Sequence, residues 1–293
     1  MPSQNIQWFP GHMAKTRRMI TENLKNVDAV IELLDARIPY SSRNPEIARL
    51  TENKPKIILL NKASLADPEK TKRWLAELKD ENTVCIETDC VTGAGLNNIS
   101  PALKKLCAEK LERYEGKGMT GRMLKAMVLG IPNVGKSSLI NKLCGNKKAK
   151  VENRPGVTLD KQWVPTNIGI LLLDMPGILW PKFEDALVGE NLAITGAIKD
   201  DILNIETIAC HLCSRLREQY PALLSTRYKL GDPSNYADLS DYDLLTYIGK
   251  KRGFLISGGE VDTERAANML LDEFRAAKIG RITLDLCPTE TEA

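Results

Sequence analysis

The residues best suited to chemistry lie together near the middle of the chain. Residues 127–140 read MVLGIPNVGKSSLI, in which an apolar run leads into Gly-x4-Gly-Lys-Ser and then into helically spaced apolar residues. In such a loop, glycines let backbone N–H groups surround phosphate oxygens, and the start of the following helix favours an anion. Lys136 is placed to bind the β- and γ-phosphates, and Ser137 to bind Mg²⁺. The pattern predicts a nucleoside triphosphate site with contacts from Asn133, Val134, Gly135, Lys136, Ser137 and Ser138.

Two switch-like segments follow this phosphate loop. Residues 168–177, IGILLLDMPG, form an apolar run that ends in Asp-x-x-Gly. Asp174 is expected to hold Mg²⁺ through a water, and the Gly177 amide to sense the γ-phosphate and its loss on hydrolysis. Between the two motifs, the stretch RPGVT supplies Thr158, which we expect to close over Mg²⁺ and the γ-phosphate. We therefore assign catalytic roles to Lys136, Thr158 and Gly177.

The motif that reads a guanine base, Asn-Lys-x-Asp after a strand, precedes the phosphate loop in this chain. Asn61 and Lys62 follow the apolar run 56–60, about 70 residues before the phosphate loop. A second stretch, CIETDCVTGAG at residues 85–95, follows at the distance expected for the other base-contacting loop, and we place Cys90 against the base. The order is therefore base loops first, phosphate loop second and switches last.

This order resembles that of the circularly permuted P-loop GTPases. The strings QWFPGHMAK at 7–15, DARIP with SSRNP at 35–45, and DMPGILWPK at 174–182 are similar to those of the ribosome biogenesis GTPase A family, and the likeness continues to residues 277–280. Permutation keeps the same sheet and site because chain ends commonly lie close together at the surface. The resemblance implies a GTPase of late large-subunit assembly. It would bind the precursor particle and its ribosomal RNA in the GTP state, be stimulated by the subunit, and leave after hydrolysis.

Three positions bear on how closely the chemistry follows the family. Ser64 stands where the family has an Asp whose carboxylate accepts two hydrogen bonds from guanine, so we expect GTP to be preferred with reduced selectivity. Ile178 stands where Ras-type GTPases have a water-orienting Gln. The resemblance suggests His12 as the substitute, since an imidazole can polarise water near neutral pH, and a surface histidine is the alternative. Asn133 resembles a position that binds K⁺ in some GTPases.

The elements that must position these residues follow an α/β pattern. Apolar runs at 29–34, 56–60, 84–87, 127–129 and 168–173 alternate with segments of helical period such as 67–79 and 101–114. After residue 181 the chain reads as helices over 188–199, 202–219, 242–250 and 263–277. We predict a circularly permuted GTPase domain with a predominantly parallel sheet at 1–180. A smaller all-α domain at 181–293 is expected to bind RNA or the ribosome.

Charge and composition agree with a nucleic-acid partner. The chain of 293 residues carries 41 basic and 38 acidic side chains, but residues 1–180 hold +9 and residues 181–293 hold −6. Basic clusters favour contact with a polyanion, although each one alone is more often a solvated surface: Lys15/Arg17/Arg18, Lys147/Lys148/Lys150 and Lys250/Lys251/Arg252. Short apolar runs, no signal-like start and seven scattered cysteines favour a cytoplasmic protein without a membrane span. We expect a monomer when it is off the ribosome.

Two other functions remain open at this point. A metabolic P-loop kinase would need an acceptor pocket and lid arginines, and no motif marks them. An RNA-binding scaffold with a weakly selective or degenerate nucleotide site is suggested by Ser64 and Ile178. Four intact residues argue against the scaffold, because a site that no longer hydrolyses nucleotide does not require them: Lys136, Ser137, Asp174 and Gly177.

Overall fold

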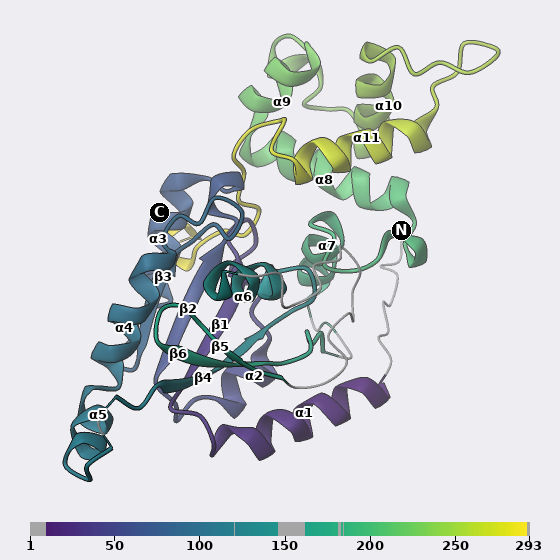
Figure 1. The fold of residues 1–293 in the computed structure, drawn as a ribbon. Helices are drawn as coiled ribbons and strands as arrows, with labels where there is room; N and C mark the ends of the chain where they lie inside the picture. Colours follow the sequence, from purple (N-terminus) through teal and green to yellow (C-terminus); the bar gives the residue numbers. More distant parts are fainter. Residues whose placement is uncertain (1–9, 120, 146–161, 181–182, 184, 292–293) are drawn as a thin grey trace.

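The computed structural model describes residues 10–119, 121–145, 162–180, 183 and 185–291 (Figure 1). Its centre is a six-stranded sheet in the order β3-β2-β1-β4-β6-β5. The strands are β1 (Ala29–Asp35), β2 (Lys56–Asn61), β3 (Thr83–Glu87), β4 (Leu124–Gly130), β5 (Gln162–Pro165) and β6 (Ile170–Asp174). All neighbouring pairs are parallel except β5 with β6. The predicted α/β class with a predominantly parallel sheet is confirmed.

The central strands are mainly apolar because both faces of the sheet are covered. Every residue of β1 and β2 is buried, as expected for parallel strands between two layers of helices. Polar residues occur at the strand ends, as Asp35, Lys56 and Asn61, and within β1 as Glu32. The Glu32 carboxylate lies 3.4 Å from Nζ of Lys56. The sheet thus forms a rigid platform whose loops emerge at its two ends.

Helices of the first half flank the sheet: α1 (Pro10–Leu24), α2 (Pro45–Leu50), α3 (Pro68–Glu77), α4 (Ile99–Leu106), α5 (Ala108–Glu115) and α6 (Lys136–Cys144). The helix predicted at 67–79 is α3, and Asp67 caps it by accepting hydrogen bonds from the amides of Glu69 and Lys70. The helix predicted at 101–114 is instead two helices, because Cys107 leaves helical geometry at their junction. Sequence reasoning placed an amphipathic helix beside His12 without giving its bounds, and it did not identify α2 as a helix.

The second half of the chain is helical in its described residues, as predicted. It contains α7 (Ala186–Ile194), α8 (Ile205–Gln219), α9 (Pro221–Tyr228), α10 (Asp241–Lys251), α11 (Thr263–Arg275) and α12 (Pro288–Thr291). Figure 1 shows α8 to α11 grouped beyond one end of the sheet, with α8 packed against α10 and α11. None of the helices in the described part of the chain is long and apolar enough to cross a membrane.

The chain after α11 returns to the first half of the protein. The amide of Ile282 donates to the Leu65 carbonyl at 3.1 Å, and the amide of Leu284 donates to the Arg37 carbonyl at 2.8 Å. The buried Thr283 hydroxyl donates to the Ala36 carbonyl at 3.1 Å. Residues 281–287 therefore pack on loops of the sheet, and the division of the chain at residue 180 remains a prediction.

This returning segment yields a stability prediction. Thr283→Val keeps the side-chain shape but removes the hydroxyl, which donates to Ala36 and accepts from the Asp67 amide at 3.1 Å. Because buried polar groups then lose their partner, we expect the free energy of unfolding in urea to fall by about 2 kcal/mol. The exposed Thr226→Val is the matched control and should change it by less than about 0.5 kcal/mol. Equal effects would contradict the prediction.

Candidate nucleotide-binding site

The phosphate loop connects the end of β4 to the start of α6. Gly135 has φ +109° and Asn133 φ +57°, so the backbone turns through left-handed conformations just before the helix. The buried Lys136 ammonium donates to the carbonyls of Gly130 at 3.1 Å and Ile131 at 2.8 Å. Burial lowers the pKa of Lys136 to about 8, although the charge of Asp174 opposes this shift. The lysine is thus held over the loop with its charge only partly compensated, which suits it to an anionic ligand.

The Asp-x-x-Gly turn lies directly against this loop. Asp174 ends β6, which pairs with β4, and a Cβ atom on Gly177 would lie 2.8 Å from the Lys136 ammonium and 2.9 Å from the Pro132 nitrogen. The amide of Ile178 donates to the Gly130 carbonyl at 3.3 Å. Only glycine fits at this contact. A change in the conformation of the turn therefore displaces residues of the phosphate loop.

The donor set near Asp174 fits a hard divalent cation. Its Oδ1 is buried and has no hydrogen-bond partner among the described residues. Burial raises the pKa of Asp174, which the charge of Lys136 and the Met175 amide only partly counter. A buried carboxylate oxygen without a partner, together with the half-buried Ser137 at the start of α6, provides the oxygen ligands that Mg²⁺ prefers. These two residues would hold the ion, directly or through water.

Asn61 joins the first base loop to the phosphate loop. Its side-chain amide donates to the Val134 carbonyl at 2.7 Å, and its Oδ1 accepts from the Cys90 amide at 3.0 Å. A Cβ atom on Gly135 would lie 2.3 Å from the Asn61 nitrogen, so glycine is required there for close approach. Three loops from separate parts of the chain are thereby fixed to one side chain.

Lys62 is positioned by an ionic cluster beneath the base loop. It has φ +61°, and its ammonium lies 2.9 Å from Oδ2 of Asp35. Arg37 binds the same carboxylate with both Nε and Nη2, at 2.9 and 2.7 Å. Burial favours protonation of Asp35, but the charges of Arg37 and Lys62 outweigh it and hold its pKa well below the usual range. The carboxylate is therefore ionised and orients Lys62.

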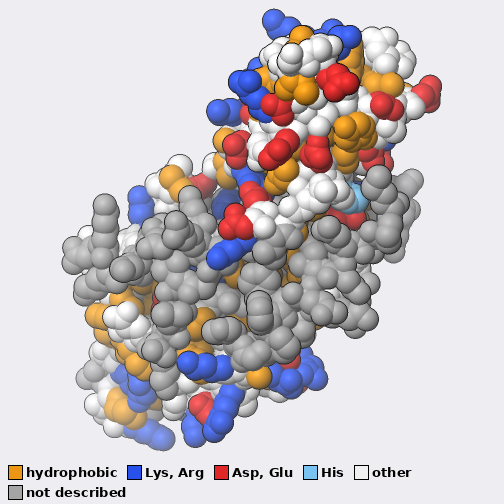
Figure 2. All heavy atoms as spheres, turned by 90° about the vertical axis from the view of Figure 1, so that its right-hand side faces the viewer, with side chains coloured by type: hydrophobic (Ala, Val, Ile, Leu, Met, Phe, Trp, Pro, Cys, Tyr) orange, Lys and Arg blue, Asp and Glu red, His pale blue; other side chains and the backbone are white. Residues whose placement is uncertain are grey.

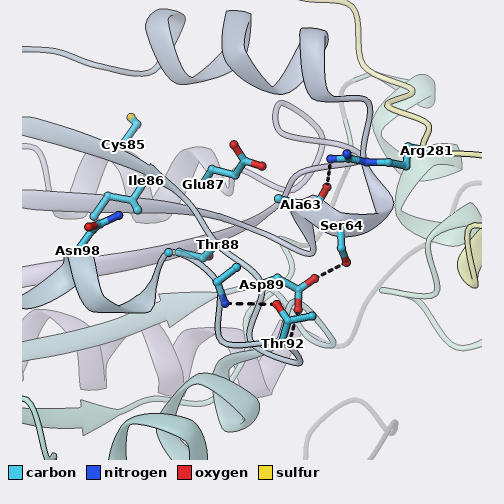
Figure 3. Close-up of a pocket in the computed structure, with 12 residues that line it drawn as sticks. Ala63, Ser64, Cys85, Ile86, Glu87, Thr88, Asp89, Thr92, Asn98 and Arg281 are labelled. Atoms are coloured by element: carbon cyan, nitrogen blue, oxygen red, sulfur yellow. Dashed lines mark hydrogen bonds between the residues drawn. The ribbon is translucent and has the colours of Figure 1, made fainter.

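Ser64 faces a carboxylate that sequence reasoning did not assign to the site. Its hydroxyl donates to Oδ2 of Asp89, on the loop after β3, and Figure 3 shows the two side chains pointing toward each other. They line a cavity of about 580 Å³ that also contacts Arg281. The sequence offered one signal for Asp89. The second base loop contains this carboxylate, whereas the first base loop has Ser64 in place of the expected Asp. Nothing local marked Arg281.

Arg281 supports the base loop from the distant end of the chain. Its Nε donates to the Ala66 carbonyl and its Nη2 to the Ala63 carbonyl, both at 2.8 Å. Ala63 begins the short 3₁₀ turn that carries Ser64, and Ala66 follows its last residue. The guanidinium therefore fixes the conformation of the loop in which the base-reading residues lie.

The structure brings most of the predicted site residues to one edge of the sheet. The loops after β2, β3, β4 and β6 all leave the carboxyl ends of parallel strands, where α/β proteins bind ligands. These loops carry Asn61, Lys62, Ser64, Cys90, Asn133, Val134, Gly135, Lys136, Ser137, Ser138, Asp174 and Gly177. Thr158 and the side chain of His12 lie outside the described residues.

The side chain of Asn133 contacts the helical half of the protein. Its Nδ2 donates to the Gly196 carbonyl, just after α7, at 2.8 Å. The atom that would coordinate a cation is the other one, the amide oxygen. The predicted K⁺ role of Asn133 therefore stays a prediction, and the residue has a further, structural role as a link between the phosphate loop and α7.

The predicted basic clusters are partly engaged in ion pairs. Arg18 contacts Glu22 at 2.8 Å, Arg17 contacts Glu46 at 3.1 Å, and Arg252 contacts Glu273 at 3.1 Å. Lys147, Lys148 and Lys150 lie outside the described residues. Figure 2 shows Lys and Arg side chains gathered at both ends of one face of the molecule. Basic surface is present at both ends, but these arginines are not all available to a polyanion.

Comparison with known proteins gives a consistent result. Residues 125–225 match a family model described as a 50S ribosome-binding GTPase. The chain is 47% identical to Ribosome biogenesis GTPase A of Bacillus cereus, covering 96% of this chain and 93% of that protein. It is 48% identical to the protein of that name from Priestia megaterium, covering 98% of both. The structure of GNP-bound YlqF from T. maritima is similar with a TM-score of 0.61 and 26% identity, covering 94% of this chain and 99% of that one.

Asn61 provides a direct test of the site. Asn61→Ala leaves the buried Val134 carbonyl and Cys90 amide without their partner. We expect binding of GDP, measured by calorimetric titration, to weaken by ~2 kcal/mol, or roughly 30-fold. Asn53→Ala, at an exposed position, serves as control and should bind GDP like the unaltered protein. Retained affinity in Asn61→Ala would place the base elsewhere.

The lowered pKa of Lys136 predicts proton uptake on nucleotide binding. With a pKa of about 8 in the free protein, half of the molecules carry a neutral lysine at pH 8, and bound phosphate favours the charged form. GDP binding at pH 8 should therefore take up about half a proton, measured by titration calorimetry in buffers of different ionisation enthalpy. Apparent affinity should fall as the pH rises through 8. Binding enthalpies independent of buffer would refute this role of Lys136.

Proposed function

The chain belongs to the ribosome biogenesis GTPase A family, and from this membership we propose that it hydrolyses GTP while acting in assembly of the large ribosomal subunit. It binds the precursor particle in the GTP state and leaves after hydrolysis. The observation that carries the GTPase part is the contact of Gly177 with Lys136, which puts the γ-phosphate sensor against the phosphate loop. High identity over nearly the whole length supports the assembly role.

Nucleotide binding requires a rearrangement of Lys136. In the free loop its ammonium binds the carbonyls of Gly130 and Ile131, and we propose that it exchanges these for the β- and γ-phosphates. Asp174, Ser137 and Thr158 would hold the metal, with Asp174 acting through water. When bound, Mg²⁺ supplies positive charge against the phosphate oxygens. The backbone amides of residues 133–138 surround the remaining oxygens.

The same contacts connect hydrolysis to the helical half. The Gly177 amide would bind the γ-phosphate, so loss of that group removes one of the contacts that hold the turn. The chain continues from this turn to α7, and the hydrogen bond from Asn133 to the Gly196 carbonyl contacts the other end of α7. The chain connection and this hydrogen bond both join the nucleotide site to α7. The helical half would therefore respond to the state of the nucleotide, which suits a domain that binds and releases a particle.

A residue other than Ile178 must activate the attacking water. The Ile178 side chain is buried in an apolar cluster with Met175 and with Ile20 of α1. It therefore packs the core, and its position does not serve catalysis. The same packing anchors α1 beside the Asp-x-x-Gly turn, and α1 begins with the segment that includes His12. We propose that His12 positions or polarises the attacking water.

We also propose that the protein binds ribosomal RNA and K⁺. The +9 charge of residues 1–180 and the exposed Lys250 and Lys251 at the end of α10 favour contact with ribosomal RNA of a large-subunit precursor. Association should then weaken steeply with salt. Asn133 is proposed to bind K⁺ through its amide oxygen, which a comparison of turnover in K⁺ and Na⁺ tests. We place the protein in the cytoplasm and expect a monomer off the ribosome.

Turnover with and without large ribosomal subunits tests this function. GTP hydrolysis should rise on addition of subunits, and ATP should not replace GTP. His12→Ala should lower stimulated turnover by about 100-fold, within the range for a lost general acid or base, and leave GDP binding intact. The matched control is His211→Ala, which alters the other histidine of the chain.

The outcomes of these turnover measurements distinguish the GTPase from an RNA-binding scaffold and from a kinase. Absence of GTP hydrolysis under all conditions, with RNA binding retained, would favour an RNA-binding scaffold. Turnover that depends on a small-molecule acceptor would favour a kinase. Stimulated turnover that survives in His12→Ala would remove His12 from the mechanism and leave the GTPase assignment in place.

A further inference from the structure

Ser64 stands where the family has a guanine-binding Asp, and a carboxylate of the other base loop, Asp89, lies beside it. The geometry points to Asp89, acting together with Ser64, as the residue that selects guanine over other bases. The inference rests on the proposed function, since it concerns the base of the same nucleotide. It starts from the hydrogen bond that Ser64 donates to Oδ2 of Asp89. The loop that lacks the expected Asp is thereby in direct contact with a carboxylate from the facing loop.

Backbone hydrogen bonds fix the orientation of Asp89. Its Oδ1 accepts from the amides of Val91 at 2.8 Å and Thr92 at 2.9 Å. Its own amide donates to the Ala94 carbonyl at 3.0 Å, and its carbonyl accepts from the Gly93 amide at 2.7 Å. With Oδ1 committed to the turn, Oδ2 is the oxygen that faces Ser64. Asp89 is therefore an oriented acceptor whose Oδ2 lies on the Ser64 side of the cavity.

The pair presents acceptors only. A serine hydroxyl has one proton, and Ser64 donates it to Asp89, so its oxygen can only accept a further hydrogen bond. Burial pushes the pKa of Asp89 up, but hydrogen bonds from the Ser64 hydroxyl and from the backbone amides of Thr92, Val91 and Ser64 outweigh this and lower it. Asp89 is therefore ionised at neutral pH. Two acceptors side by side match the two donors of guanine, N1–H and the exocyclic amine.

Other bases do not match this arrangement. Adenine presents an acceptor at N1 and only a C–H group at C2, and xanthine presents an oxygen where guanine has its amine. Either base would set a lone pair against Asp89 or leave a buried acceptor without a donor, which is costly in a polar site. An isolated serine could instead donate to adenine. Asp89 removes this option by taking the Ser64 proton.

The location of Asp89 agrees with this role. The neighbouring Cys90 amide donates to Asn61, which in turn holds the Val134 carbonyl of the phosphate loop. Ser64 lies two residues after Lys62, and Asp89 is only 4% exposed. Figure 3 shows the pair between the loops after β2 and β3. A base stacked in this region would meet the pair with its Watson–Crick edge.

Asp89→Asn reverses the hydrogen-bonding character without changing the shape. Because the Val91 and Thr92 amides require an acceptor at the Oδ1 position, the new NH₂ group must occupy the Oδ2 position and donate. We expect GDP affinity, measured by calorimetric titration, to fall about 10- to 100-fold and XDP affinity to rise. Asp80→Asn is the matched control, since Asp80 also accepts from a backbone amide and a hydroxyl, at the other end of β3. It should leave both affinities unchanged.

A reciprocal swap guards against loss of folding. Ser64→Asp combined with Asp89→Ser returns the carboxylate to the first loop and the hydroxyl to the second, and it should restore GDP preference that Asp89→Ser alone loses. An unchanged GDP to XDP ratio in Asp89→Asn, or a swap that binds no better than Asp89→Ser, would overturn the role of Asp89. A wild-type protein that binds ADP as tightly as GDP would overturn the proposed GTPase function itself.

Discussion

The two hydrogen bonds of the Asn61 side chain are the contact on which the nucleotide site depends. One reaches the phosphate loop and the other reaches the second base loop, although these loops are separated in the chain by dozens of residues. The carboxyl ends of parallel strands lie at one edge of the sheet. The loops that follow these strands are therefore neighbours, and the short Asn61 side chain is long enough to connect them. Gly135 is part of the same constraint, since any side chain there would occupy the space of the Asn61 amide.

Buried charge explains why the site is ready for an anion and a cation before either is bound. Lys136 and Asp174 are both desolvated. Burial lowers the pKa of Lys136 and raises that of Asp174, so the neutral form of each is favoured. Asp35, by contrast, is paired with Arg37 and Lys62 and stays ionised. The first pair is incompletely satisfied, since Oδ1 of Asp174 has no hydrogen-bond partner among the described residues, as we expect of groups proposed to bind phosphate and Mg²⁺. In the Asp35 cluster both carboxylate oxygens are bonded to cations, and this holds the Lys62 side chain in place.

Sequence reasoning predicted the parallel strands and the position of the phosphate loop between β4 and α6, and it did poorly where distant segments meet. The strands are continuous apolar runs, and the phosphate loop has a spacing that few other structures require. The antiparallel β5 and the short α2 lack such signals. The partnership of Ser64 with Asp89, and that of Thr283 with Ala36, depend on tertiary proximity. No periodicity or spacing in the chain encodes a contact across 247 residues.

The support of the base loop by residues 281–287 sets an order of events during synthesis. Ala63 receives its hydrogen bond from a residue made 218 positions later, which at ordinary translation speed means a delay of roughly 10 to 40 seconds. Closure of so long a loop is also slow by itself. A nascent chain therefore holds its phosphate loop before its base loop is fully supported. The proposed discrimination between nucleotides would then be a property of the finished protein, gained after the sheet has formed.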